Sequence, residues 1–84
     1  MIYLHYFAKI REALGSQGEE IEFDEHCKDV ESLLKILKSR GEPWTDLLGA
    51  SIPVLVAVNQ VVIKNNQVLC DGDEVAFFPP VTGG

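Results

Sequence analysis

The sequence predicts an α+β fold of the β-grasp type, with one main helix packed on a mixed sheet of about five strands. Its length of 84 residues suits a single domain spanning residues 1–84 and leaves no room for a second one. A strand, a turn and a strand precede one long helical segment, and three short strands follow it. We therefore expect the first and last strands to lie side by side at the centre as a parallel pair, joined through the crossover.

The first part of the chain predicts two strands separated by a helical turn. Residues 2–8 are apolar and aromatic, which is typical of a strand. Residues 9–15 predict a short helix that ends at Gly15, because glycine readily adopts the left-handed conformation of a helix C-cap. Residues 19–24 alternate charged and apolar side chains, as an antiparallel strand with one face in water does.

The main helix is predicted over residues 30–39, with Asp29 as its N-cap and Gly41 as its stop signal. Apolar residues recur at the spacing that places them on one helix face, namely Val30, Leu33, Leu34 and Leu37. Residues 43–49 then predict a short helical connection, for which a 3₁₀ helix is one candidate. Trp44 in this connection is expected to pack as a large apolar side chain.

Three further strands are predicted in the last third of the chain. Residues 54–58 form an apolar run that predicts a buried strand, and residues 61–63 return as a short strand after the break at Asn59-Gln60. Residues 71–73 predict a tight turn that leads into the last strand, residues 74–78.

The last strand has two faces that the sequence distinguishes. Because an unpaired carboxylate is costly to bury, Glu74 marks the open face, which assigns Phe77 to the core and Phe78 to the open face. The same alternation in the first strand places Phe7 on the open face, and Val62 is expected to join them. Aromatic side chains left in water indicate a docking surface for a partner. The alternative is a one-residue slip of the assignment, which would place Phe7 and Phe78 in the core.

Composition argues against several classes of partner. The net charge of −6 and the pI of about 4.7 disfavour nucleic acid and anionic membrane surfaces, and favour a partner with a basic face. The N-terminus lacks the basic and apolar regions of a signal peptide, and no run approaches the about 20 apolar residues of a membrane span. Cys27 and Cys70 lie far apart and are expected to be free thiols, so we expect a cytoplasmic protein.

The C-terminal tail, residues 79–84, is expected to be flexible and to carry the chemistry. Pro79 and Pro80 stop strand pairing because proline has no N–H to donate, and they direct the tail outward. Gly83 and Gly84 lack a Cβ, so an extended Gly-Gly can enter a tunnel that is too narrow for side chains. The terminal carboxylate can attack the α-phosphate of ATP to give an acyl-adenylate, which a sulfur nucleophile can then take. The alternative is an ordinary small-residue chain end.

The whole chain resembles the family of molybdopterin synthase small subunits, which are ubiquitin-like sulfur carriers. The resemblance rests on a long C-terminal run and on short segments elsewhere. These are Asp71-Gly72-Asp73-Glu74-Val75-Ala76-Phe77-Phe78-Pro79-Pro80-Val81-Thr82-Gly83-Gly84, Asn59-Gln60, Phe7-Ala8 and Arg11-Glu12.

The resemblance implies a function and a set of partners. An ATP-dependent adenylyltransferase would activate Gly84, and a sulfurtransferase system would convert it to a thiocarboxylate, that is, a 1-thioglycine. The tail, Pro79 to Thr82 followed by Gly83, would then enter the large subunit of molybdopterin synthase within a heterotetramer and give sulfur to cyclic pyranopterin monophosphate. The resemblance also implies that Phe7, Val62 and Phe78 form the partner interface. It implies no bound cofactor, no metal and no independent active site.

Other functions remain open for the same tail. The chain could be the sulfur carrier of the thiamine pathway, or a ubiquitin-like modifier that joins Gly84 to a lysine of a target protein. A passive interaction module is a third possibility. His5 and His26 do not have metal-ligand spacing, and Cys70 is expected to act as a small hydrophobic residue at a strand end.

Overall fold

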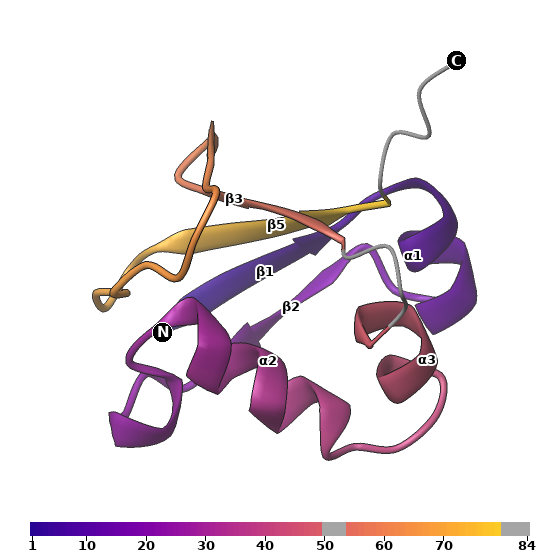
Figure 1. Cartoon of the computed structure of the whole chain (residues 1–84), viewed down its shortest axis with the longest axis horizontal. Coiled ribbons are helices and arrows are strands. Elements are labelled where there is room, and N and C mark those ends of the chain that lie inside the picture. Colours follow the sequence, from indigo (N-terminus) through magenta and orange to yellow (C-terminus); the bar gives the residue numbers. More distant parts are fainter. Residues whose placement is uncertain (50–53, 80–84) are drawn as a thin grey trace.

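A computed structural model of the chain describes residues 1–49 and 54–79. Within them the structure is a five-stranded sheet packed against helices (Figure 1). The elements in chain order are β1 (Ile2–Tyr6), α1 (Ala8–Leu14), β2 (Gly18–Ile21), the 3₁₀ helix η1 (Glu25–Cys27), α2 (Val30–Lys38), α3 (Trp44–Leu48), β3 (Leu55–Val58), β4 (Val61–Val62) and β5 (Glu74–Phe78). Of the predicted tail, Pro80, Val81, Thr82, Gly83 and Gly84 lie outside the described residues.

The strand order confirms the predicted fold class. It is β2-β1-β5-β3-β4, with β1 and β5 parallel at the centre and the other pairs antiparallel. Helices α2 and α3 lie on one face of this sheet, and α1 lies at the end of β1 (Figure 1). The last strand begins and ends at the residues that the sequence predicts, and the sheet is mixed as expected.

The core lies between the sheet and α2. Along β1 and β5, alternate side chains are fully or almost fully buried, as the two-residue period of a strand requires. The apolar stripe of α2 supplies the opposite wall. The core residues from these three elements are Ile2, Leu4, Tyr6, Val75, Phe77, Val30, Leu33 and Leu37.

Helix α2 forms and ends close to the predicted positions. The Asp29 carboxylate accepts a hydrogen bond from the backbone N–H of Ser32 at 2.8 Å, so Asp29 is the predicted N-cap. Hydrogen bonds from the Ser32 side chain and from the Ser32 backbone N–H lower the pKa of Asp29 below its usual range. The helix ends at Lys38, one residue before the predicted end, and the left-handed Gly41 follows the last turn with φ of 89°.

The first strand is shorter than predicted. It ends at Tyr6 rather than residue 8, because Ala8 has a positive φ of 52° and turns the chain directly into α1. Helix α1 ends at Gly15, which caps it in the predicted left-handed conformation with φ of 65°. The second strand ends at Ile21, and residues 25–27 form the 3₁₀ helix η1 that the sequence reasoning missed. The connection that begins at Trp44 is an α-helix rather than a 3₁₀ helix.

A two-residue turn joins β3 to β4 and fixes the start of β5. Asn59 and Gln60 both have positive φ, at 49° and 70°, as the type I′ turn that suits the twist of a hairpin requires. The side-chain oxygen of Asn59 accepts from the Glu74 N–H at 3.1 Å, and its amide nitrogen donates to Asp73 at 3.0 Å. These bonds hold the β3–β4 hairpin to the first residue of the last strand.

A polar cluster joins the edge of the sheet to the helices. Arg40 donates two hydrogen bonds to the two carboxylate oxygens of Glu19, at 2.7 and 2.8 Å, and its guanidinium lies over the ring of Trp44. The hydroxyl of Tyr6 donates to Glu19 at 2.8 Å. Hydrogen bonding to Arg40 holds the pKa of Glu19 below its usual range, and burial raises the pKa of Tyr6. The cluster therefore ties β1 and β2 to the segment that links α2 with α3.

Alanine substitutions at Phe77 and Phe78 should separate the two faces of β5. Phe77 is 0% exposed, so Phe77→Ala should lower the free energy of unfolding by about 3–5 kcal/mol or prevent folding altogether. Phe78 is only partly buried, so Phe78→Ala should cost about 1 kcal/mol. Urea unfolding of the two variants measures both values. Equal losses would show that the two faces are wrongly assigned.

The Glu19–Arg40 pair should make stability depend on pH. Because the folded-state pKa of Glu19 is lowered, its contribution is present above the ordinary carboxylate range and is lost as the pH falls through the folded-state value. Glu19→Gln should therefore cost about 1 kcal/mol at neutral pH and less at about pH 3. Urea unfolding at both pH values tests this, with the exposed Glu12→Gln as the control. A cost for Glu19→Gln that does not change with pH would contradict the prediction.

Candidate functional site

The face of the sheet opposite α2 is a candidate docking surface. Strand register places partners in adjacent strands on the same side of the sheet, so the row Val62, Ala57, Ala76 and His5 crosses four strands on this face. Val62 is 58% exposed, and Ala76 is partly exposed. The predicted membership of Val62 in the open face is confirmed.

Phe7 and Phe78 meet at the end of this face. Their rings stack with centroids 4.6 Å apart and planes 5° from parallel. Phe7 is 41% exposed, and its backbone N–H donates to the carbonyl of Phe77 at 3.2 Å, which extends the β1–β5 ladder by one bond. The stack is therefore built by the central strand pair, as the sequence predicts. The alternative of a one-residue slip is wrong.

Leu55 extends the apolar area, and the sequence reasoning missed it. It pairs with Phe78 in the β3–β5 ladder and is 37% exposed. Its neighbours in β3 are buried, so the apolar run 54–58 gave no sign of an exposed side chain. The register between β3 and β5 would have revealed it, because Leu55 stands opposite Phe78. We call Phe7, Leu55, Val62 and Phe78 the aromatic half of the open face.

The other end of the open face is acidic. The Glu74 carboxylate lies 3.1 Å from Nε2 of His5, and its side chain is 52% exposed. Glu20 stands opposite Tyr3 in the β1–β2 ladder and is exposed. We call Glu20 and Glu74, with Tyr3 and His5 between them, the acidic half of the open face.

The tail leaves the fold beside the aromatic half. Pro79, the last described residue, follows directly on Phe78 and is partly buried. Because β5 is a central strand, the tail begins at the middle of the sheet's end rather than at an edge. The predicted site residues Pro80, Val81, Thr82, Gly83 and Gly84 fall outside the described residues, so their roles stay predictions.

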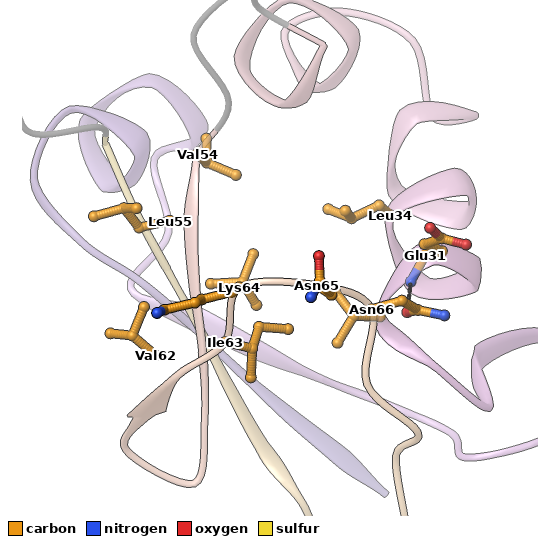
Figure 2. Close-up of a pocket in the computed structure, with 11 residues that line it drawn as sticks. Glu31, Leu34, Val54, Leu55, Val62, Ile63, Lys64, Asn65 and Asn66 are labelled. Carbon is orange, nitrogen blue, oxygen red and sulfur yellow. Dashed lines mark hydrogen bonds between the residues drawn. The ribbon is translucent and has the colours of Figure 1, made fainter.

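A groove lies next to the open face, between α2 and β3 (Figure 2). Its volume is about 780 Å³, and it shares Leu55 and Val62 with the aromatic half. One of its walls is held by a hydrogen bond from the Glu31 N–H to the side-chain oxygen of Asn66 at 2.9 Å. Sequence reasoning did not predict this groove. Its lining comes from α2, from β3 and the residue before it, and from β4 and the segment after it: Val30, Glu31, Leu34, Val54, Leu55, Val56, Val62, Ile63, Lys64, Asn65 and Asn66.

Neither cysteine belongs to the aromatic half or to the acidic half of the open face. Cys27 and Cys70 are both free thiols, and Cys27 is buried. Cys70 is exposed, so the expectation that it packs as a small hydrophobic residue is wrong; it lies in the loop before β5, outside any strand. In residues 1–49 and 54–79, no three His, Cys, Asp or Glu side chains are grouped so that they could hold a metal ion. No helix among the same residues is long and apolar enough to span a membrane.

Comparisons with known proteins agree with this geometry. The model of the ThiS family matches residues 4–84. The molybdopterin synthase sulfur carrier subunit of Escherichia coli is 40% identical over 84 residues, and the match covers 100% of both chains.

Two solved structures share the fold. One is the complex of subunits 1 and 2 of molybdopterin-converting factor from Helicobacter pylori, with a TM-score of 0.69 and 28% identity over 99% of this chain and 97% of that one. The other is SAMP1 from Haloferax volcanii, with a TM-score of 0.73 and 26% identity over 99% of this chain and 98% of that one.

The family model and the full-length relative lead to the same assignment. The β-grasp order of strands and the central β1–β5 pair agree with it. The chain therefore belongs to the ThiS family, within which it matches the molybdopterin synthase sulfur carrier subunits over its whole length.

Proposed function

We propose that this protein is the sulfur carrier subunit of a molybdopterin synthase and works in molybdenum cofactor biosynthesis. The observation that carries the proposal is the full-length match, at 40% identity, to a relative of that name. The open face supports it, because a carrier must dock on other proteins and the aromatic half lies where the tail begins. The protein itself supplies sulfur to the reaction rather than catalysing it.

The loading chemistry takes place at Gly84 in two steps. A carboxylate oxygen of Gly84 attacks the α-phosphorus of ATP on an adenylyltransferase, and pyrophosphate leaves. A sulfur nucleophile at the oxidation level of sulfide, supplied by a sulfurtransferase, then attacks the carbonyl carbon. AMP leaves, and Gly84 ends in a thiocarboxylate. The carbon is not oxidised or reduced in either step. The need for ATP supports a cytoplasmic location.

Delivery takes place in the active site of the large subunit. The Gly83-Gly84 end is narrow enough to enter a tunnel that excludes side chains, and in the sequence residues 79–82 link it to the last strand. The thiocarboxylate sulfur passes to cyclic pyranopterin monophosphate, and water restores the carboxylate of Gly84. Two such transfers build the dithiolene of molybdopterin. The Helicobacter pylori complex of two subunits supports a large-subunit partner, and we propose a heterotetramer that uses Phe7, Val62 and Phe78 at the interface.

A ubiquitin-like modifier is the second candidate. The likeness to SAMP1, whose name describes a small archaeal modifier protein, favours it at 26% identity. Such a protein would join Gly84 to a lysine of a target through the same acyl-adenylate. The thiamine-pathway carrier shares the loading chemistry and differs only in the acceptor of the sulfur.

The sulfur-carrier proposal predicts a change in mass at Gly84. After incubation with an adenylyltransferase, ATP and a sulfur source, the intact mass should rise by the replacement of one oxygen by sulfur. Fragmentation should place the change on Gly84, because oxidation of the exposed Cys70 would add nearly the same mass. Cys70→Ala should therefore still gain the mass, while a variant lacking Gly84 should not.

Three outcomes decide between the candidates. Mass gain at Gly84 followed by release of sulfur to cyclic pyranopterin monophosphate on the large subunit supports the proposed function. Loading with transfer only to a thiazole precursor supports the thiamine pathway, and an isopeptide bond to lysine supports a modifier. If the mass never changes with partners that load a known carrier, the tail is passive and the proposal fails.

A further inference from the structure

The open face carries two chemically different halves along one line. Phe7 and Phe78 of the aromatic half lie at the C-terminal ends of β1 and β5, and Glu74 of the acidic half lies at the N-terminal end of β5. Glu74 and Phe78 are the first and last residues of β5, so about 13 Å separate Glu74 from Phe78. A partner that covers the aromatic half and a few neighbouring residues would also reach Glu74.

The charged side chains of the strands are all carboxylates, apart from His5 when it is protonated. The five strands contain three carboxylates and no Lys or Arg. One carboxylate, Glu19, is paired with Arg40 on the helix side, which leaves Glu20 and Glu74 for the open face. The positively charged residues lie elsewhere: Lys28, Lys35, Lys38 and Arg40 within or next to α2, Lys9 and Arg11 in α1, and Lys64 after β4.

The Glu74 side chain is held in place by its neighbours and keeps one carboxylate oxygen accessible to a partner. Nε2 of His5 lies 3.1 Å from Oε1 of Glu74, and the Glu74 backbone is fixed by Asn59. Among the described residues, Oε2 of Glu74 has no hydrogen-bond partner and the side chain is half exposed. An ordered carboxylate with one free oxygen loses little side-chain entropy when a cation of a partner binds it.

We propose that the large subunit presents Lys or Arg side chains to the acidic half, and that these contacts set the direction in which the open face docks. This rests on the proposed function, since the large subunit is the partner named there. An apolar patch such as the aromatic half contributes binding affinity, but it fixes poorly how the two proteins are rotated relative to each other. Ion pairs between the partner and Glu74, about 13 Å from Phe78, define that relative orientation. The same opposite charges also steer the two proteins toward each other as they associate. The direction matters because the tail must point into the partner's active site.

The test compares two double variants that remove the same charge. Glu20→Gln with Glu74→Gln removes the acidic half, and Glu42→Gln with Asp46→Asn removes two exposed carboxylates at and next to α3 on the helix side. Stopped-flow mixing with the isolated large subunit gives the association rate at several NaCl concentrations. The acidic-half variant should associate about 5- to 10-fold more slowly at low salt, and the control less than about 2-fold. The difference should nearly vanish at about 0.5 M NaCl, where charges are screened.

The possible results distinguish failure of the docking inference from failure of the proposed function. Equal association rates for wild type and the acidic-half variant would overturn the inference, and so would equal slowing by both double variants, which would show that only net charge matters. Glu20→Gln alone, at an exposed position of an edge strand, should give part of the slowing with the fold intact. If the wild-type protein does not bind the large subunit at any salt concentration, the proposed function fails as well.

Discussion

The parallel pairing of β1 with β5 is the constraint on which the rest of the structure depends. Tyr3, Leu4, His5 and Tyr6 stand opposite Glu74, Val75, Ala76 and Phe77. The pair joins residues from the two ends of the sequence, so it closes a long loop and must be supported by burial to offset the lost chain entropy. The support comes from Leu4, Tyr6, Val75 and Phe77, which are almost completely buried against α2 and its neighbours.

This register also decides which side chains are available to a partner. Since successive residues of a strand point to opposite faces, burying Tyr6 and Phe77 leaves Phe7 and Phe78 on the open face. The register that buries Tyr6 and Phe77 in the core therefore also brings the rings of Phe7 and Phe78 together. The tail begins where the β1–β5 pairing ends. The register of this strand pair therefore determines the core, the open face and the position at which the tail starts.

The sequence predicted the centre of the fold better than its connections. Residues 74–78 were predicted with the right limits because a turn precedes them and Pro79 follows them. The end of β1 was missed because Ala8 adopts a positive φ, which alanine rarely does and which its residue type does not predict. Leu55 and the groove were missed for a similar reason, because both depend on how neighbouring strands and α2 are placed relative to each other.

The candidate site was predicted unevenly. The sequence could assign three residues to one face, Phe7, Val62 and Phe78. Side chains alternate between the two faces of a strand, and the carboxylate of Glu74 shows which face is in water. The exposure of Cys70 could not be predicted, because a single thiol in a loop carries no pattern. The chemistry expected of Gly84 rests on its terminal carboxylate and on the family resemblance, and Gly84 lies outside the described residues.

The parallel arrangement of β1 and β5 has a mechanical consequence. Met1 lies at one end of the pair, and Pro79 follows its other end. A force that pulls the tail away from the N-terminus therefore loads the hydrogen bonds of the ladder all at once, in shear, instead of opening them one by one. In an antiparallel pair whose pulled ends lie next to each other, the same force would break the hydrogen bonds one after another. The end of β5 at which the tail begins is thus held against pulling by the whole β1–β5 ladder.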